Sequence, residues 1–461
     1  MLVVISIISI SILLLGFLYS NWRSGISRSI ISHFWFFTLA WCLAFPIRAL
    51  LISYGLIDLQ VVREWQDDEL IFAIMLSLLY WGVVYAGYLS VRKKQVNHDA
   101  LGKVDFPGAQ RGFIVIIITM LLGMYFLYNT TFSGEIFEGN QQNEARVGSG
   151  GFFLLAELFL LAAIAYLGRV MCLHRKWILN SREWALYTGI FLMLVMMMVA
   201  LNSRRFLALL LLSFVVVYSV KHTRRWIIPV VAIVGSIFLL PVLQILRYIN
   251  ISSVLDGSLD FGDLLSALGG ERFMLTSISS SYEGIDHVAN FLEKVGWLGA
   301  FAGVDGGIAW FYNAFLALIP RNLWSDKPMI YGSVAQQFLL YPDMYAAGAA
   351  TTTLPVSFVV DFTYGFGILG GLILCFILGR FLAIMSHDLW DRGGEPVSKA
   401  IALFVFINIF NVVRGGTGFI QSLVLFLVIT AFMFGFRNTY VSMISILRRV
   451  FALSSLRRPN V

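Results

Sequence analysis

Long apolar runs separated by short polar segments extend from one end of the chain to the other. A helix that crosses a hydrocarbon core about 30 Å thick needs about 20 such residues. Strands of an outer-membrane barrel are about 10 residues long and alternate in polarity, which these runs do not. The pattern therefore predicts an all-α integral membrane protein with about eleven transmembrane helices. The expected spans are 2–19, 34–56, 69–91, 112–130, 151–172, 184–202, 206–220, 226–247, 356–384, 399–413 and 418–436.

Composition agrees with this prediction. Hydrophobic residues make up 59% of the chain and charged residues 13%, whereas a soluble domain has about 25% charged residues. Only residues 248–350 leave room for a sizeable segment outside the membrane. We expect one polytopic membrane domain over 1–461, with 248–350 as a large periplasmic loop.

Basic residues predict the orientation. The net charge of +7 does not indicate a nucleic-acid partner, because the basic residues are spread over short loops between spans. If the loop with Arg23 and Arg28 is cytoplasmic, about two thirds of the Lys and Arg residues fall on the cytoplasmic side, and most acidic residues fall on the other. This bias predicts a multi-pass protein whose N-terminus is external and whose C-terminus is cytoplasmic.

The large loop contains two segments with helical character. Residues 284–297 carry apolar side chains on one helical face. Residues 310–319 are aromatic and apolar but too short to span a bilayer, which favours an interfacial or re-entrant helix. We therefore expect this loop to be a lid folded back onto the membrane face.

A small set of arginines lies on the side that the orientation rule disfavours. One interpretation is that they anchor helix ends by reaching for lipid headgroups. The other is phosphate binding, since guanidinium is a planar, permanently charged, bidentate donor. Two or three of these groups could hold a diphosphate leaving group without a metal, and we favour this interpretation for the set as a whole. The set is Arg204, Arg205, Arg247 and Arg414 near span ends, with Arg146 and Arg321 in loops.

Carboxylates and one histidine are candidates for proton transfer. Glu283 is the first choice for a general base and His287 the second, because both lie on or beside the helical segment of the large loop, next to Asp286. The alternative is that they form the solvated face of a surface helix. Glu157 and Asp361 fall within expected spans, where a carboxylate is costly; either a water-filled vestibule hydrates them or they pair with Arg48.

The cysteines, Cys42, Cys172 and Cys375, all lie in or at the ends of apolar spans. Their spacing matches neither a disulfide framework nor a metal site. We interpret them as small buried hydrophobic side chains, and we expect no metal or other cofactor.

The order of these parts resembles the Wzy-type polymerases of bacterial surface polysaccharides, including the polymerase of enterobacterial common antigen. The resemblance covers about residues 200–435, and Arg204-Arg205 departs from the single arginine expected in the first block. The blocks that carry it are Asn202-Ser203-Arg204-Arg205, Leu246-Arg247-Tyr248, Ile319-Pro320-Arg321-Asn322-Leu323-Trp324 with Lys327-Pro328 and a later Thr353/Pro355 segment before a Gly-rich span, and Asn411-Val412-Val413-Arg414-Gly415.

The resemblance implies a metal-independent membrane glycosyltransferase of GT-C type in the bacterial inner membrane. Such an enzyme joins undecaprenyl diphosphate-linked oligosaccharide repeat units at the periplasmic face into O-antigen-like polysaccharide, including that of lipopolysaccharide. The arginines would hold the departing diphosphate, Tyr248 would orient them, and Arg146, Arg321 and Lys327 would bind glycan or headgroup. Besides the lipid-linked substrate, we expect membrane lipid as a partner. The sequence leaves open whether a chain-length regulator binds.

Three other functions remain open at this stage. An O-antigen ligase uses a similar donor but a lipid A core acceptor. A flippase for lipid-linked oligosaccharide would need charges along a central path and mostly short loops, whereas this chain has one long external loop. An assembly scaffold would leave the arginine set unexplained.

Overall fold

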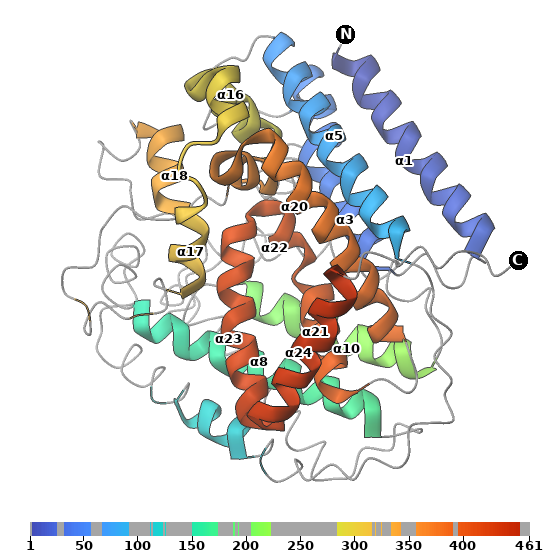
Figure 1. The fold of residues 1–461 in the computed structure, drawn as a ribbon. Coiled ribbons are helices and arrows are strands. Elements are labelled where there is room, and N and C mark those ends of the chain that lie inside the picture. The colour runs from blue at the N-terminus through green and yellow to red at the C-terminus, as the bar shows by residue number, and fades with distance from the viewer. Residues whose placement is uncertain are drawn as a thin grey trace, which may run out of the picture.

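The computed structural model describes parts of the chain between residues 2 and 451, and in these parts it contains helices and no strand (Figure 1). The predicted all-α class is confirmed for this part. The described residues are 2–24, 32–56, 67–91, 111, 114–122, 125, 150–173, 188, 189, 192, 204–222, 284–315, 319, 324, 333–342, 356–390 and 395–451.

Most of the named elements coincide with apolar runs of the sequence, whereas α18 and α24 were not expected and the expected span 399–413 is divided into α21 and α22. They are α1 (Leu2–Ser24), α3 (His33–Cys42), the π-helix η1 (Leu43–Ile47), α4 (Arg48–Ser53), α5 (Asp67–Ser90), α8 (Gly150–Leu173), α10 (Arg204–His222), α16 (Gly284–Ala302), α17 (Ile308–Phe315), α18 (Ser333–Leu340), α20 (Phe358–Trp390), α21 (Pro396–Ile407), α22 (Ile409–Arg414), α23 (Gly416–Phe434) and α24 (Phe436–Phe451). The expected span at 226–247 lies outside the described residues, and those at 112–130 and 184–202 are described only in part.

Three helical stretches of the described residues are long and apolar enough to cross a membrane: His33–Ser53, Asp68–Ser90 and Phe358–Trp390. Large apolar side chains are exposed at helical spacing on α5, for example Phe72, Met75 and Leu79. Water would disfavour such a surface, whereas lipid tails would solvate it. The protein is a helical membrane protein.

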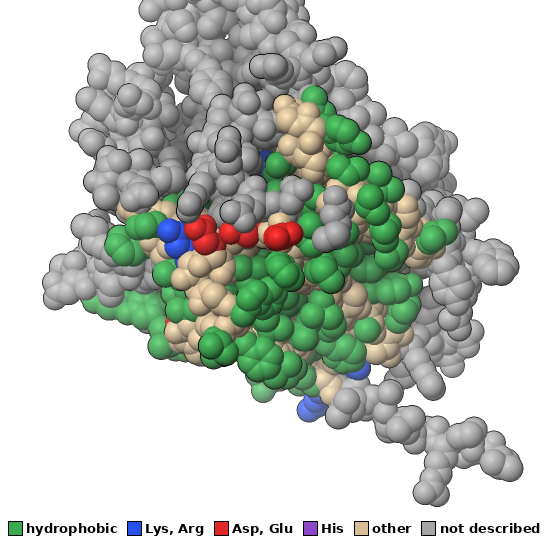
Figure 2. All heavy atoms as spheres, turned by 90° about the horizontal axis from the view of Figure 1, so that it is seen from above, with side chains coloured by type: hydrophobic (Ala, Val, Ile, Leu, Met, Phe, Trp, Pro, Cys, Tyr) green, Lys and Arg blue, Asp and Glu red, His purple; other side chains and the backbone are tan. Residues whose placement is uncertain are grey.

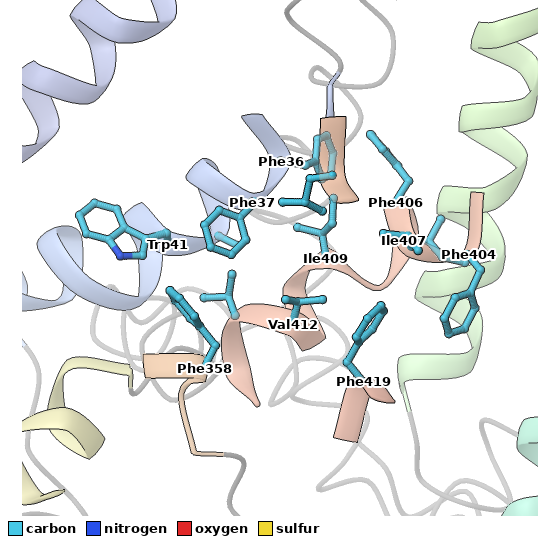
Figure 3. Close-up of a cluster of buried hydrophobic side chains, with 14 of the residues drawn as sticks. Phe36, Phe37, Trp41, Phe358, Phe404, Phe406, Ile407, Ile409, Val412 and Phe419 are labelled. Carbon is cyan, nitrogen blue, oxygen red and sulfur yellow. The ribbon is translucent and has the colours of Figure 1, made fainter. Parts of the chain in front are cut away.

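The buried core lies where α3, α20, α21, α22 and α23 meet (Figure 3). Aromatic side chains fill it: Phe36 of α3 packs against Phe406 of α21 with ring centroids 4.5 Å apart, and Phe404 stacks on Phe426 of α23 at 4.4 Å. This core joins the first third of the chain to its last quarter.

Glycine permits the closest helix contact, between α5 and α20. A Cβ placed on Gly379 would lie 2.0 Å from the Val84 carbonyl oxygen, and one on Gly87 would lie 2.1 Å from that of Phe376. Small residues at both positions let the two backbones approach, as is common between membrane helices.

A proline shapes the helix that carries Arg48. Pro46 lies inside η1 and has no N–H to donate, so the regular i→i−4 ladder cannot continue through it. The wider π-turn changes the direction in which the following side chains point. Gly284, the first residue of α16, packs closely on this turn, since a Cβ there would lie 3.0 Å from the Ala44 Cβ.

The segment after α16 is fixed to α20 by backbone contacts. The Val304 N–H donates to the Tyr364 carbonyl at 2.7 Å. Gly303 (φ 83°) and Gly367 (φ 68°) have left-handed backbones and lie against each other, so that a Cβ on Gly367 would be 3.0 Å from the Gly303 nitrogen. Thus α16 and α17 lie on the bundle at the first turns of α20.

The end of the molecule that carries α16 and the start of α5 is amphipathic. Seen from above, a short row of acidic side chains with a basic neighbour lies beside a hydrophobic surface (Figure 2). Exposed charged residues of these helices include Asp68, Glu293 and Lys294. Exposed Trp297 contacts Phe72 edge-to-face with centroids 5.5 Å apart. Charges beside aromatic side chains are typical of a membrane–water boundary.

Candidate functional site

The first turns of α16 carry a group of buried polar side chains that meets two other parts of the bundle. Asp286, His287 and Asn290 are 0%, 3% and 5% exposed. The helix predicted from 284 is confirmed, but its polar residues are not the solvated face that the sequence left open as an alternative. We define the arginine–histidine cluster as Arg48, Asp286, His287, Tyr341 and Arg414.

The first contact of the cluster is an ion pair. The Arg48 guanidinium of α4 donates through Nε to Asp286 Oδ2, and both side chains are buried. Burial raises the pKa of the Asp286 carboxyl, and the adjacent Arg48 charge opposes that rise. Asp286 Oδ1 has no hydrogen-bond partner among the described residues. A charge in such surroundings is tolerated only with its counter-ion, so each partner keeps the other in place.

The second contact joins His287 to the residue that follows α18. His287 Nδ1 and the Tyr341 hydroxyl lie 2.5 Å apart, and Asn290 Nδ2 donates to the Leu340 carbonyl at 2.8 Å. Burial, followed by the charges of Arg48 and Arg414, lowers the pKa of His287 to about 3. The imidazole is therefore neutral at physiological pH.

Arg414 comes from a distant part of the sequence. It is the last residue of α22, half-buried, and its charge acts on His287. A cation at a helix C-terminus also interacts favourably with the helix dipole, so a structural role is the simplest alternative. The cluster nevertheless brings Arg414, a member of the predicted arginine set, and Arg48, 366 positions away in sequence, to act on one imidazole.

Most other residues proposed from the sequence cannot be compared with this cluster. α10 begins at Arg204 and Arg205 and packs against α8 and α21, but their side chains are outside what the structure describes. Six further predictions lie outside the described residues: Glu283, Arg247, Tyr248, Arg146, Arg321 and Lys327. Glu283 directly precedes α16 in sequence.

The two carboxylates in expected spans are both buried. Glu157 of α8 accepts a hydrogen bond of 2.6 Å from the Ser422 hydroxyl of α23. Asp361 lies in the first turn of α20, and its carbonyl accepts from Trp310 Nε1 of α17 at 3.3 Å. Arg48 forms an ion pair with Asp286, a partner that the sequence interpretation did not consider for it.

Three members of the cluster, Arg48, Asp286 and Tyr341, were missed as site residues. Arg48 was a clue, because a basic residue inside an apolar run needs a counter-ion. Tyr341 had no signal in the sequence, since nothing there relates the end of α18 to α16. In the described part of the chain, no group of three or more His, Cys, Asp or Glu side chains is suited to hold a metal ion.

The fold and the cluster together define a helical membrane protein with a buried, arginine-rich polar centre close to one end of its bundle. Comparison with known proteins adds no relative: no family model matches the chain, and no curated protein or solved structure matches it either.

The neutral state of His287 predicts a pH-dependent stability. The pKa of this imidazole is about 3 in the folded protein, against the ordinary histidine value of 6.5 expected in the unfolded chain, so between these values only the unfolded state gains the proton. We expect the free energy of unfolding to fall as the pH is lowered from about 6.5, with a slope of up to about 1.4 kcal/mol per pH unit from this group. Denaturant unfolding of wild type and His287→Gln in detergent measures this, and parallel pH curves would contradict it.

Proposed function

We propose that the protein is a polymerase that joins undecaprenyl diphosphate-linked oligosaccharide repeat units at the periplasmic face of the bacterial inner membrane. In this proposal it is a metal-independent glycosyltransferase with about eleven spans and a GT-C-like fold. Its N-terminus is periplasmic and its C-terminus cytoplasmic. The observation that supports it most is that the charges of Arg48 and Arg414 both act on the buried imidazole of His287.

We assign different roles to the two arginines. Arg48 is held by Asp286 in a buried ion pair, so its charge is largely compensated and it positions α16. Arg414 is half-buried, at the end of α22, and we assign it to the diphosphate. Fixed positive charge aimed at a developing anion is usually the largest contribution to catalysis of such transfers. Arg204, Arg205 and Arg247 remain proposed as further diphosphate ligands.

The reaction needs a proton acceptor. The acceptor hydroxyl oxygen bonds to the anomeric carbon of the donor, the bond from that carbon to the diphosphate oxygen breaks, and the hydroxyl proton moves to the base. A base works best with a pKa near the working pH, and His287, with a pKa of about 3, is too weak. Glu283 therefore stays our first choice.

Bound substrate would change the state of His287. A diphosphate beside Arg414 would offset part of the positive charge that lowers the histidine pKa. The pKa of His287 would then rise toward its ordinary value, and the imidazole would become a better base or proton carrier in the complex than in the free protein. In this way His287 stays the second candidate.

Purified protein supplied with a lipid-linked repeat unit in detergent tests the function directly. Polymer that remains on undecaprenyl diphosphate is the expected product. Transfer only to lipid A core would identify a ligase instead. Absence of any elongation, with the fold intact by thermal unfolding, would reject the glycosyltransferase and favour a flippase or a scaffold.

A further inference from the structure

The C-terminal helix α24 has three different faces. Thr439, Ser442, Ile446 and Val450 are buried against the bundle. Phe436, Tyr440, Leu447 and Phe451, which share a second face because they are spaced by four, seven and four residues, are 67%, 66%, 43% and 60% exposed. The third face carries the exposed polar side chains Arg437, Ser445 and Arg448 together with one exposed apolar side chain, Val441.

This helix packs against α20, α21 and α23. It follows α23 directly after Gly435, whose backbone is left-handed (φ 92°). At its far end, Arg449 makes a bidentate ion pair with Asp388 near the end of α20, with N–O distances of 2.6 and 2.7 Å. Arg380 of α20 connects the end of α24 to the end of α5. It donates to the Arg449 carbonyl at 3.2 Å and to the Ser90 hydroxyl at 3.4 Å.

The level of α24 is that of a membrane surface. α16 and its following turn contact α20 near Gly367, whereas α24 contacts it between Arg380 and Asp388. The helix between residues 368 and 390 is about 34 Å long, close to the thickness of a hydrocarbon core of about 30 Å. α24 therefore lies at the surface opposite α16.

The exposed apolar face of α24 continues the apolar surface of α23. Val428 and Phe432 of α23 are 45% and 59% exposed, and the Phe432 ring meets that of Phe436 at 5.5 Å. Lipid tails that cover α23 would thus reach the apolar face of α24 without a break. Arg437 and Arg448 lie beside that face, where headgroup phosphates would be.

We propose that α24 is an interfacial helix that binds acidic phospholipid headgroups at this surface. Its apolar face enters the boundary between tails and headgroups, and Arg437 and Arg448 bind the phosphates. The Arg449–Asp388 pair fastens the helix to the bundle, so bound lipid also stabilises the contact of α24 with α20. This proposal is independent of the glycosyltransferase.

Nitroxide labels test the position of the helix in the membrane. The label is placed at Leu447→Cys or, as a matched control two residues away on the polar face, at Ser445→Cys, in full-length protein whose cysteines are replaced by alanine. Single copies are held in nanodiscs with phosphatidylglycerol. We expect oxygen to relax the label at 447 and a water-soluble nickel complex to relax the label at 445. Equal access of nickel to both positions would overturn the proposal, and so would a label at 447 shielded from both reagents, which would indicate a protein partner.

Binding of phosphatidylglycerol tests the role of the basic side chains of α24. Phosphatidylglycerol bound to the purified protein is titrated and counted by native mass spectrometry. Arg437→Gln or Arg448→Gln is expected to weaken its binding about 5-fold each, whereas Lys294→Gln, which removes an exposed cation near the opposite surface, is expected to leave it unchanged. Equal losses from Arg448→Gln and Lys294→Gln would contradict a specific role for α24.

Discussion

Replacing Arg414 by alanine is expected to abolish long polymer and to slow the addition of repeat units by about 10²–10³-fold, the range found when one donor to a developing anion is removed. Arg414 is the arginine of the arginine–histidine cluster that we assign to the diphosphate. Its guanidinium would stabilise the charge that appears on the leaving group as the glycosidic bond forms. Initial rates and chain lengths of purified variants on gels measure the effect.

Two further variants separate catalysis from stability. Arg414→Lys keeps the charge but not the planar pair of donors, so we expect an intermediate rate. Lys294→Ala removes an exposed cation of α16 outside the cluster and is expected to polymerise at the wild-type rate. Long chains made by Arg414→Ala at the wild-type rate would remove the assigned role, provided that thermal unfolding shows the variant to be folded.

Breaking the ion pair between Arg48 and Asp286 is expected to produce the largest loss of stability. Arg48→Met removes the counter-ion of a fully buried carboxylate, and Asp286→Leu removes a counter-ion of a guanidinium that is almost fully buried. Such a loss costs about 3–5 kcal/mol. The double variant Arg48→Met/Asp286→Leu removes both charges and is expected to recover most of this free energy of unfolding, because a well-packed apolar pair can replace a buried ion pair.

Unfolding of the three variants in detergent gives the coupling between the two positions. Single variants as stable as the wild type would mean that water or another group compensates the remaining charge. The double variant also tests the proposed function, because it keeps Arg414 and His287 while it removes the group that positions α16. If the double variant is stable but polymerises slowly, the ion pair positions α16 for the reaction in addition to stabilising the protein.

The sequence predicted the helices more successfully than the site. An unbroken apolar run marks a helix such as α5 or α20 because the cost of leaving backbone groups unpaired in lipid permits little else. The buried face of α16 could be inferred in part from the spacing of Ile285, Val288 and Phe291. The burial of Asp286 and His287 could not, because it depends on η1, α4 and α18 meeting the same helix.

The sequence by itself determined that this is a helical membrane protein and gave the ranges of most described helices. It also singled out Arg414 and His287 as candidate site residues. Only the tertiary structure decided that Arg48 pairs with Asp286, that Tyr341 meets His287 and that α24 packs against α20, α21 and α23. The reason is physical. Hydrophobicity is a property of each side chain, so an apolar segment can be recognised from consecutive residues. An ion pair depends on which distant helices the packing of the core brings together.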